Sequence, residues 1–142
     1  MPEIVEITDA LVAVLNAQSW TPNFQAERAY QPSFELKDLK TLKVTVVPKG
    51  VTITQVTREK ASHDYQVDVG VQKKFQKGDA VELDPLMELV QQIADLFRAK
   101  RLNGMLAAMW LKSEINPLYS LEHMEQYRQF TSVVTFTFRV IR

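Results

Sequence analysis

The spacing of hydrophobic residues changes along the chain. Apolar residues recur at intervals of three and four in residues 3–18 and again after residue 84, as on the buried face of an amphipathic helix. Between these segments, and again at the C-terminal end, apolar and polar residues alternate, as in half-buried antiparallel strands. The order of helix, several strands, helix and strand predicts an α+β fold of two layers, a mainly antiparallel sheet with two helices packed on one face.

The later helices carry boundary signals of their own. A long helix is predicted over residues 84–103, with Asp84 as N-cap, Pro85 at the first helical position and an Asn-Gly pair at its end. The segment SLEHMEQY predicts one or two further helical turns, capped by Ser120.

The alternating segments predict the strands. Residues 24–30 predict a short strand, and residues 42–46 and 51–57 predict the arms of a hairpin that turns at residues 48–50. The segment HDYQVDVGVQKKF, residues 63–75, places apolar residues on one face and polar residues on the other. The terminal segment FTSVVTFTFRVIR alternates in the same way, so we expect a strand that is integral to the core.

Two long segments show no regular spacing. Residues 31–41 are predicted as a loop, and residues 103–129 as a second one, in which LAAMWLKSEI fits either a strand or an extended loop. Long ordered loops usually carry function, and neither segment contains a catalytic set. We therefore expect both to contact a partner, and to be mobile in the free protein and ordered on docking.

The composition is that of a single globular domain, residues 1–142. The chain has 17 Lys+Arg and 17 Asp+Glu, so its formal net charge is zero. Proteins that grip nucleic acid or an anionic membrane surface normally have a basic excess, so neither partner is expected. Zero net charge also removes one protection against self-association, which suits an oligomer. The N-terminal residues are acidic where a secretory signal would be basic, and we expect a protein made for use inside a cell.

The inventory of reactive residues is small. The sequence contains no cysteine, which excludes disulfides, thiolate nucleophiles and cysteine-ligated metal centres. Its four glycines form no phosphate-binding loop, and no metal-binding spacing such as H-E-x-x-H is present. We therefore expect no cofactor and no metal.

The nearest approach to a catalytic pair is His63 with Asp64, a base and an orienting carboxylate. Adjacent residues on a strand point to opposite faces, however, so the two are poorly placed to act on one substrate. We interpret His63 and His123 as ordinary surface histidines. The alternative is a small metal-dependent hydrolase or nuclease using His63, Asp64, Asp68 and Glu35, the last of which begins an E-x-K element.

Residues outside the regular stripes are candidates for subunit contact. The basic group at the end of strand 63–75 is either a solvated strand end that blunts edge pairing or a charge contact to a neighbouring subunit. The aromatic residues near prolines are either interface anchors or lids on a small core. The predicted subunit-interface residues are Tyr30, Lys73, Lys74, Lys77, Trp110 and Tyr119.

Most of the sequence resembles a family of phage proteins. The resemblance is carried by RAYQPSFELKDLKTLKVTVVPKG, HDYQVDVGVQKK and YRQFTSVVTFTFRVIR. These segments are similar to small proteins of phage and prophage structural gene clusters, in the neck and tail-completion group, akin to tail terminators of the minor tail protein U type. The resemblance covers roughly residues 9–142 in motif order and length.

This resemblance implies a ring, commonly six-fold, at the joint between the tail tube and the head connector. The implied partners are further copies of the chain, the tail tube protein and a head connector or stopper protein, with no sequence-specific nucleic acid and no membrane. The chain would be a monomer when isolated, and would lie in the virion tail or neck after assembly in the host cytoplasm. The resemblance implies a structural protein and no enzyme.

Overall fold

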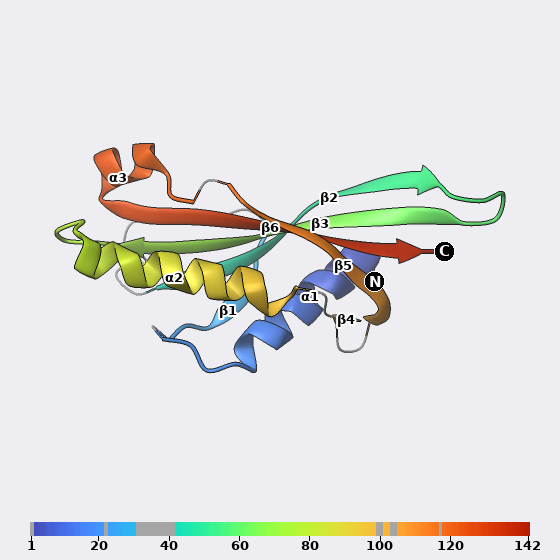
Figure 1. Ribbon diagram of the computed structural model, residues 1–142, viewed down its shortest axis with the longest axis horizontal. Helices are drawn as coiled ribbons and strands as arrows, with labels where there is room; N and C mark the ends of the chain where they lie inside the picture. Colours follow the sequence, from blue (N-terminus) through green and yellow to red (C-terminus); the bar gives the residue numbers. More distant parts are fainter. Residues whose placement is uncertain (1, 22, 31–41, 99–100, 103–104, 117) are drawn as a thin grey trace.

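The computed structural model describes residues 2–21, 23–30, 42–98, 101–102, 105–116 and 118–142 (Figure 1). In chain order the elements are α1 (Glu3–Asn16), β1 (Ala26–Arg28), β2 (Lys43–Gln55), β3 (Ala61–Lys74), α2 (Ala80–Leu96), β4 (Arg101–Leu102), β5 (Met105–Ile115), α3 (Leu121–Tyr127) and β6 (Gln129–Ile141).

The strands of the described residues form one six-stranded sheet in the order β1-β2-β3-β6-β5-β4. Only β1 and β2 pair in parallel, and the other neighbours are antiparallel. The terminal strand β6 lies between β3 and β5, so the last residues of the chain join segments that are distant in sequence. The predicted α+β fold with a mainly antiparallel sheet is confirmed.

The hydrophobic core covers one face of the central strands. The cross-strand pairs Val67–Phe136 and Val69–Val134 are fully buried on this face. Phe97, which follows α2, packs edge-on against Phe136 with ring centroids 4.9 Å apart. Both long helices contribute to the same cluster, with Ile7, Leu11 and Leu15 from α1 and Leu86, Leu89, Val90 and Ile93 from α2.

The boundaries predicted for the second helix are wrong at both ends. Helix α2 begins at Ala80, one turn before Asp84, because Asp79 is its N-cap and accepts a hydrogen bond from the backbone N–H of Glu82 at 3.2 Å. Pro85 therefore lies inside the helix. Its missing N–H would have bonded to the carbonyl of residue 81, and water can reach that position because Val81 is 83% exposed. The helix ends at Leu96, well before residue 103.

The predicted hairpin turn at residues 48–50 is also wrong. Strand β2 continues through these residues, with a register shift between Pro48 and Gly50. Proline is tolerated at such a bulge on an edge strand, and the pairing of β1 with β2 ends before it, at Val46. The chain turns instead at residues 56–60, where the N–H groups of Val56 and Thr57 each donate to the carbonyl of Lys60 at 3.0 Å. The hairpin is therefore much longer than predicted.

Residues 103–129 are not the long loop that we expected. They contain the strand β5, which lies between β6 and β4, and the short helix α3. The segment LAAMWLKSEI is therefore a strand and not an extended loop. The cap predicted for the short helix is confirmed, because the side chain of Ser120 accepts from the N–H of His123 at 3.3 Å. The strand predicted at residues 24–30 is reduced to Ala26–Arg28, and residues 31–41 lie outside the described residues.

Candidate functional site

The described residues of the hydrolase hypothesis, His63, Asp64 and Asp68, do not share one face of β3. His63 lies on the core side of β3, opposite Ile53 and Val140, and is only 8% exposed. The interpretation of His63 as a surface histidine is therefore wrong, and its ring stacks beside that of Tyr65, with centroids 6.2 Å apart. Asp64 follows on the other face of the strand. Glu35 lies outside the described residues, and no cluster of three or more potential metal ligands is found within them.

The two aspartates of β3 are engaged by neighbouring strands. Asp64 accepts two hydrogen bonds from the guanidinium of Arg139, at 2.7 and 3.0 Å, and this pairing lowers the pKa of Asp64 despite partial burial. Asp68 accepts from the hydroxyl of Thr135 at 2.6 Å, and Lys49 approaches the same carboxylate at 4.0 Å. These contacts fix the register of β3 between its neighbours.

The Asp64–Arg139 pair should make stability depend on pH. The pKa of Asp64 is lower in the folded state than in the unfolded state, where it lies near 3.8. The pair therefore contributes its full stabilisation of the fold above pH 3.8, and loses it as the pH falls through the folded-state pKa. The urea midpoint of Asp64→Asn should therefore lie below that of the wild type at neutral pH, and the difference should shrink in acid. Glu88→Gln, at an exposed position of α2, is the control. A difference that stays constant down to strongly acidic pH would contradict this assignment.

The buried imidazole of His63 predicts an unusual substitution effect. Its Nδ1 has no hydrogen-bond partner among the described residues, and an unpaired buried polar atom destabilises the fold. Replacing His63 by Leu should leave the free energy of unfolding unchanged or raise it by up to about 1 kcal/mol, as measured by urea denaturation. A clear loss of stability would show that the imidazole makes a compensating contact.

The second histidine also lies against the sheet. His123 of α3 is half-buried, and its Nδ1 lies 2.8 Å from the hydroxyl of Thr131 on β6. His123 is therefore partly exposed, as expected of a surface residue, but it makes a specific contact with the sheet. This contact helps to hold α3 against the first residues of β6.

The predicted interface residues occupy different environments. Tyr30 is 76% exposed, with the guanidinium of Arg28 5.8 Å from its ring centroid, and Tyr119 is 40% exposed. Trp110 lies within β5 and packs against the core, and its indole N–H donates to Ser113 at 2.8 Å. The structure therefore places Trp110 on the sheet and not on a loop.

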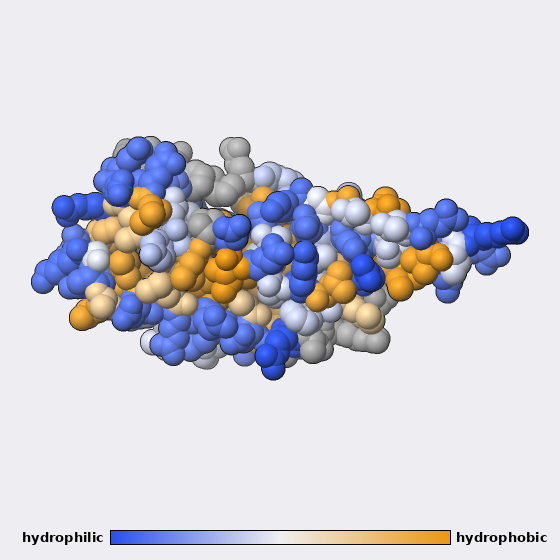
Figure 2. All heavy atoms as spheres, turned by 45° about the horizontal axis from the view of Figure 1, so that its top comes forward, coloured by the Kyte–Doolittle hydropathy of each residue, from blue (hydrophilic) through white to orange (hydrophobic). Residues whose placement is uncertain are grey.

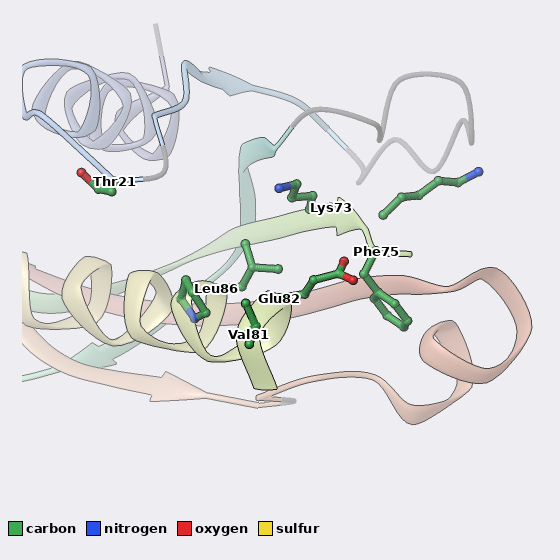
Figure 3. A pocket seen from close by; sticks show the side chains of 8 residues that line it. Thr21, Lys73, Phe75, Val81, Glu82 and Leu86 are labelled. Atoms are coloured by element: carbon green, nitrogen blue, oxygen red, sulfur yellow. The ribbon is translucent and has the colours of Figure 1, made fainter. Parts of the chain in front are cut away.

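The three lysines lie where the sequence predicted, at and just beyond the end of β3. Lys73 and Lys74 line a pocket of about 360 Å³ beside the first turn of α2, and Figure 3 shows Lys73 across the pocket from Val81. Lys77 is exposed in the following turn. The turn is fixed by Glu82, whose carboxylate accepts the N–H groups of Gln76 and Lys77 at 2.9 and 2.6 Å, which lowers the pKa of Glu82.

The feature that sequence reasoning missed is a projecting hairpin. We call residues 50–62 the arm, because this part of β2 and β3 extends beyond both long helices (Figure 1). Val51, Ile53 and Val56 are 44%, 63% and 54% exposed, and Figure 2 shows apolar surface on the arm close to its hydrophilic tip. Beyond Val46 the outer edge of β2 has no partner strand among the described residues.

The arm has a fixed direction. At its base the hydroxyl of Tyr65 donates to the carboxylate of Glu3 on α1, and the guanidinium of Arg142 binds the same carboxylate at 3.2 Å. Ala61 and Arg142 exchange two backbone hydrogen bonds of 3.0 Å. The base is therefore tied to α1, whereas β6 runs beside the arm as far as Ala61, next to the turn at residues 56–60. The arm points away from the core.

A second surface feature lies at the opposite end of the molecule. We call it the cleft, a pocket of about 250 Å³ between α2 and α3. It is lined by Gly78, Asp79, Ala80, Leu83, Asp84, Met87, Tyr119, Leu121, Met124 and Phe130. Phe130 is buried at its base, whereas Leu121 is 63% exposed. The arm lies at one end of the longest axis in Figure 1, and α3 with the first turn of α2, whose residues line the cleft, lies at the other.

Comparison with known proteins found no match to this chain. No family model matches this sequence, and no curated protein matches it significantly. No helix among the described residues is long and apolar enough to cross a membrane.

Proposed function

We propose that this chain is a structural subunit of a phage tail or neck, which assembles into a closed ring at the head–tail joint as a tail terminator or a tail-completion protein. Two lines support the proposal: the sequence resemblance of residues 9–142 to that group, and the projecting arm. The proposal assigns the chain no catalytic role and no cofactor. Its partners are further copies of itself, the tail tube protein and the head connector or stopper protein.

The arm is the observation that carries the proposal. Its apolar side chains Val51, Ile53 and Val56 stay 44–63% exposed, because the helices do not extend over them. An exposed apolar strand with a free edge is a liability for a solitary protein, and contact with another molecule removes it. A subunit whose contacts form only during assembly would tolerate this exposure.

The position of these two surfaces, at the two ends of one subunit, is also consistent with a ring. Closed rings form when one patch of each copy binds a different patch of the next copy and the rotation between copies closes. The arm and the cleft are two different patches, because the elements that form them lie at opposite ends of the molecule. If each contact between two copies is weak, the chain is expected to be a monomer in isolation and to form a ring only on the tail.

Removing the apolar character of the arm should prevent assembly. We expect the variant Val51→Thr, Ile53→Thr, Val56→Thr to keep the urea midpoint of the wild type, because Thr retains the β-branched shape that strands favour. Analytical ultracentrifugation with purified tail tubes should show rings for the wild type and monomers for this variant. Val81→Thr, which changes an exposed valine far from the arm, should assemble like the wild type.

Two results would count against the proposal. Equal assembly of the wild type and the triple variant would remove the arm from the interface. Failure of the wild type to form a ring, even at high concentration or on tail tubes, would overturn the ring itself.

A further inference from the structure

We propose that the tip of the arm of one copy docks into the cleft of the next copy, an inference that rests on the proposed ring. The tip comprises residues 56–60, in which Val56 is 54% exposed. The cleft has a volume of about 250 Å³, and offers apolar surface that the chain's own core leaves uncovered.

The apolar surfaces of the two sites are complementary in kind. Leu83, Met87 and Met124 line the cleft and are partly buried, above Phe130, which is 1% exposed. At its rim Leu121 is 63% exposed. An exposed apolar pocket of this kind is stabilised when an apolar side chain displaces its water, and Val56 presents such a side chain at the end of the arm.

The charges of the two sites are also complementary. Asp79 and Asp84 line the cleft, and none of its lining residues is a lysine or arginine. The tip carries Arg58 and Lys60 against one acid, Glu59. All three tip residues are exposed, and within the described part of the chain neither Arg58 nor Lys60 forms an ion pair. Opposite charge around an apolar contact fixes its orientation and excludes wrong partners.

The positions of the arm and the cleft require that the cleft be occupied by another molecule. The arm is tied at its base and points away from the core. Helix α3 and the start of α2, whose residues line the cleft, lie at the opposite end of the molecule (Figure 1). The tip therefore cannot reach its own cleft. We favour a second copy as the occupant. If the arm of each copy binds the cleft of the next copy, every arm and every cleft is occupied once the ring closes.

Engineered cysteines test this contact directly, because the chain has no cysteine of its own. A mixture of Val56→Cys and Leu121→Cys chains, assembled on tail tubes and oxidised, should give a disulfide-linked dimer. The competing arrangement would pair the free edge of β2 with the edge of β5, where Leu111 is 39% exposed. A parallel mixture of Ile53→Cys and Leu111→Cys chains reports on it and should remain unlinked.

Charge exchange gives a second, independent test. Reversing the tip with Arg58→Glu and Lys60→Glu should weaken assembly at least about tenfold in dissociation constant. Reversing the cleft with Asp84→Lys should weaken it similarly. Mixing the two variants should restore assembly, because in a ring where they alternate each reversed tip meets a reversed cleft and each wild-type tip meets a wild-type cleft. Asp79 is left unchanged because it caps α2. Asp95→Lys, which reverses an exposed carboxylate of α2 outside the cleft, is the matched control.

The outcomes separate this inference from the proposed function. If rings form but the cysteines at positions 56 and 121 do not crosslink, or if those at positions 53 and 111 do, the docking of the arm into the cleft is wrong. The proposed ring itself would still stand. A link from the tip to the tail tube protein would show that the cleft's occupant is not a second copy. If no ring forms with the wild type, both proposals fail together.

Discussion

Removing residues 133–142 should leave a chain with no cooperative unfolding transition. These residues are most of β6, which lies between β3 and β5. Without them the sheet is divided into two parts that have no other strand in common. The deletion also removes four core side chains that are at most 3% exposed, Val134, Phe136, Phe138 and Val140. Circular dichroism during urea titration should show a broad change, and the chain should bind hydrophobic dyes as molten states do.

A shorter truncation is the control for this deletion. Ile141 and Arg142 are both exposed, although Arg142 exchanges backbone hydrogen bonds with Ala61. A chain that ends at residue 140 should therefore still unfold cooperatively, with a modestly lower midpoint. If the longer deletion unfolds as sharply as this control, β6 is an accessory strand and the core does not depend on it.

Phe136→Ala should lower the free energy of unfolding by about 3–5 kcal/mol, the usual range for a buried phenylalanine. Phe136 is fully buried. Its ring lies edge-on to Phe97, with centroids 4.9 Å apart, so the substitution removes an aromatic pair as well as apolar area. The cavity would open between the sheet and the end of α2, where neighbouring strands restrict collapse. Urea denaturation followed by tryptophan fluorescence measures the change.

Ile53→Ala is the matched control for this substitution. Ile53 lies on a strand like Phe136 but is 63% exposed, so we expect a change within about 0.5 kcal/mol. A loss above about 2 kcal/mol in this control would show that the arm belongs to the folding core. The two variants therefore separate the residues that stabilise the subunit from those that we assign to assembly.

The sequence alone determined the fold class and the faces of the main strands. Alternation in HDYQVDVGVQKKF placed Tyr65 and Val67 on the side that proves buried, because successive side chains of a strand point to opposite faces whatever surrounds it. The cap at Ser120 was also readable, since it depends on residues within one helical turn. The start of α2 was readable in principle from Asp79 and Glu82, which have the spacing of an N-cap and its third helical residue, but Asp84-Pro85 is a competing start signal.

Only the tertiary structure decided which apolar faces are covered. In VTITQVT the alternation resembles that of a core strand, yet Ile53 is exposed because no helix extends over the arm. His63, the partner of Ile53, is nevertheless buried, since Val140 lies on its other side and the ring of Tyr65 stacks beside it. The cleft likewise requires α2 and α3 to meet across residues that are far apart in sequence. Periodicity shows which side chains share a face, whereas coverage depends on long-range packing, and for this chain long-range packing decides where the candidate assembly surfaces lie.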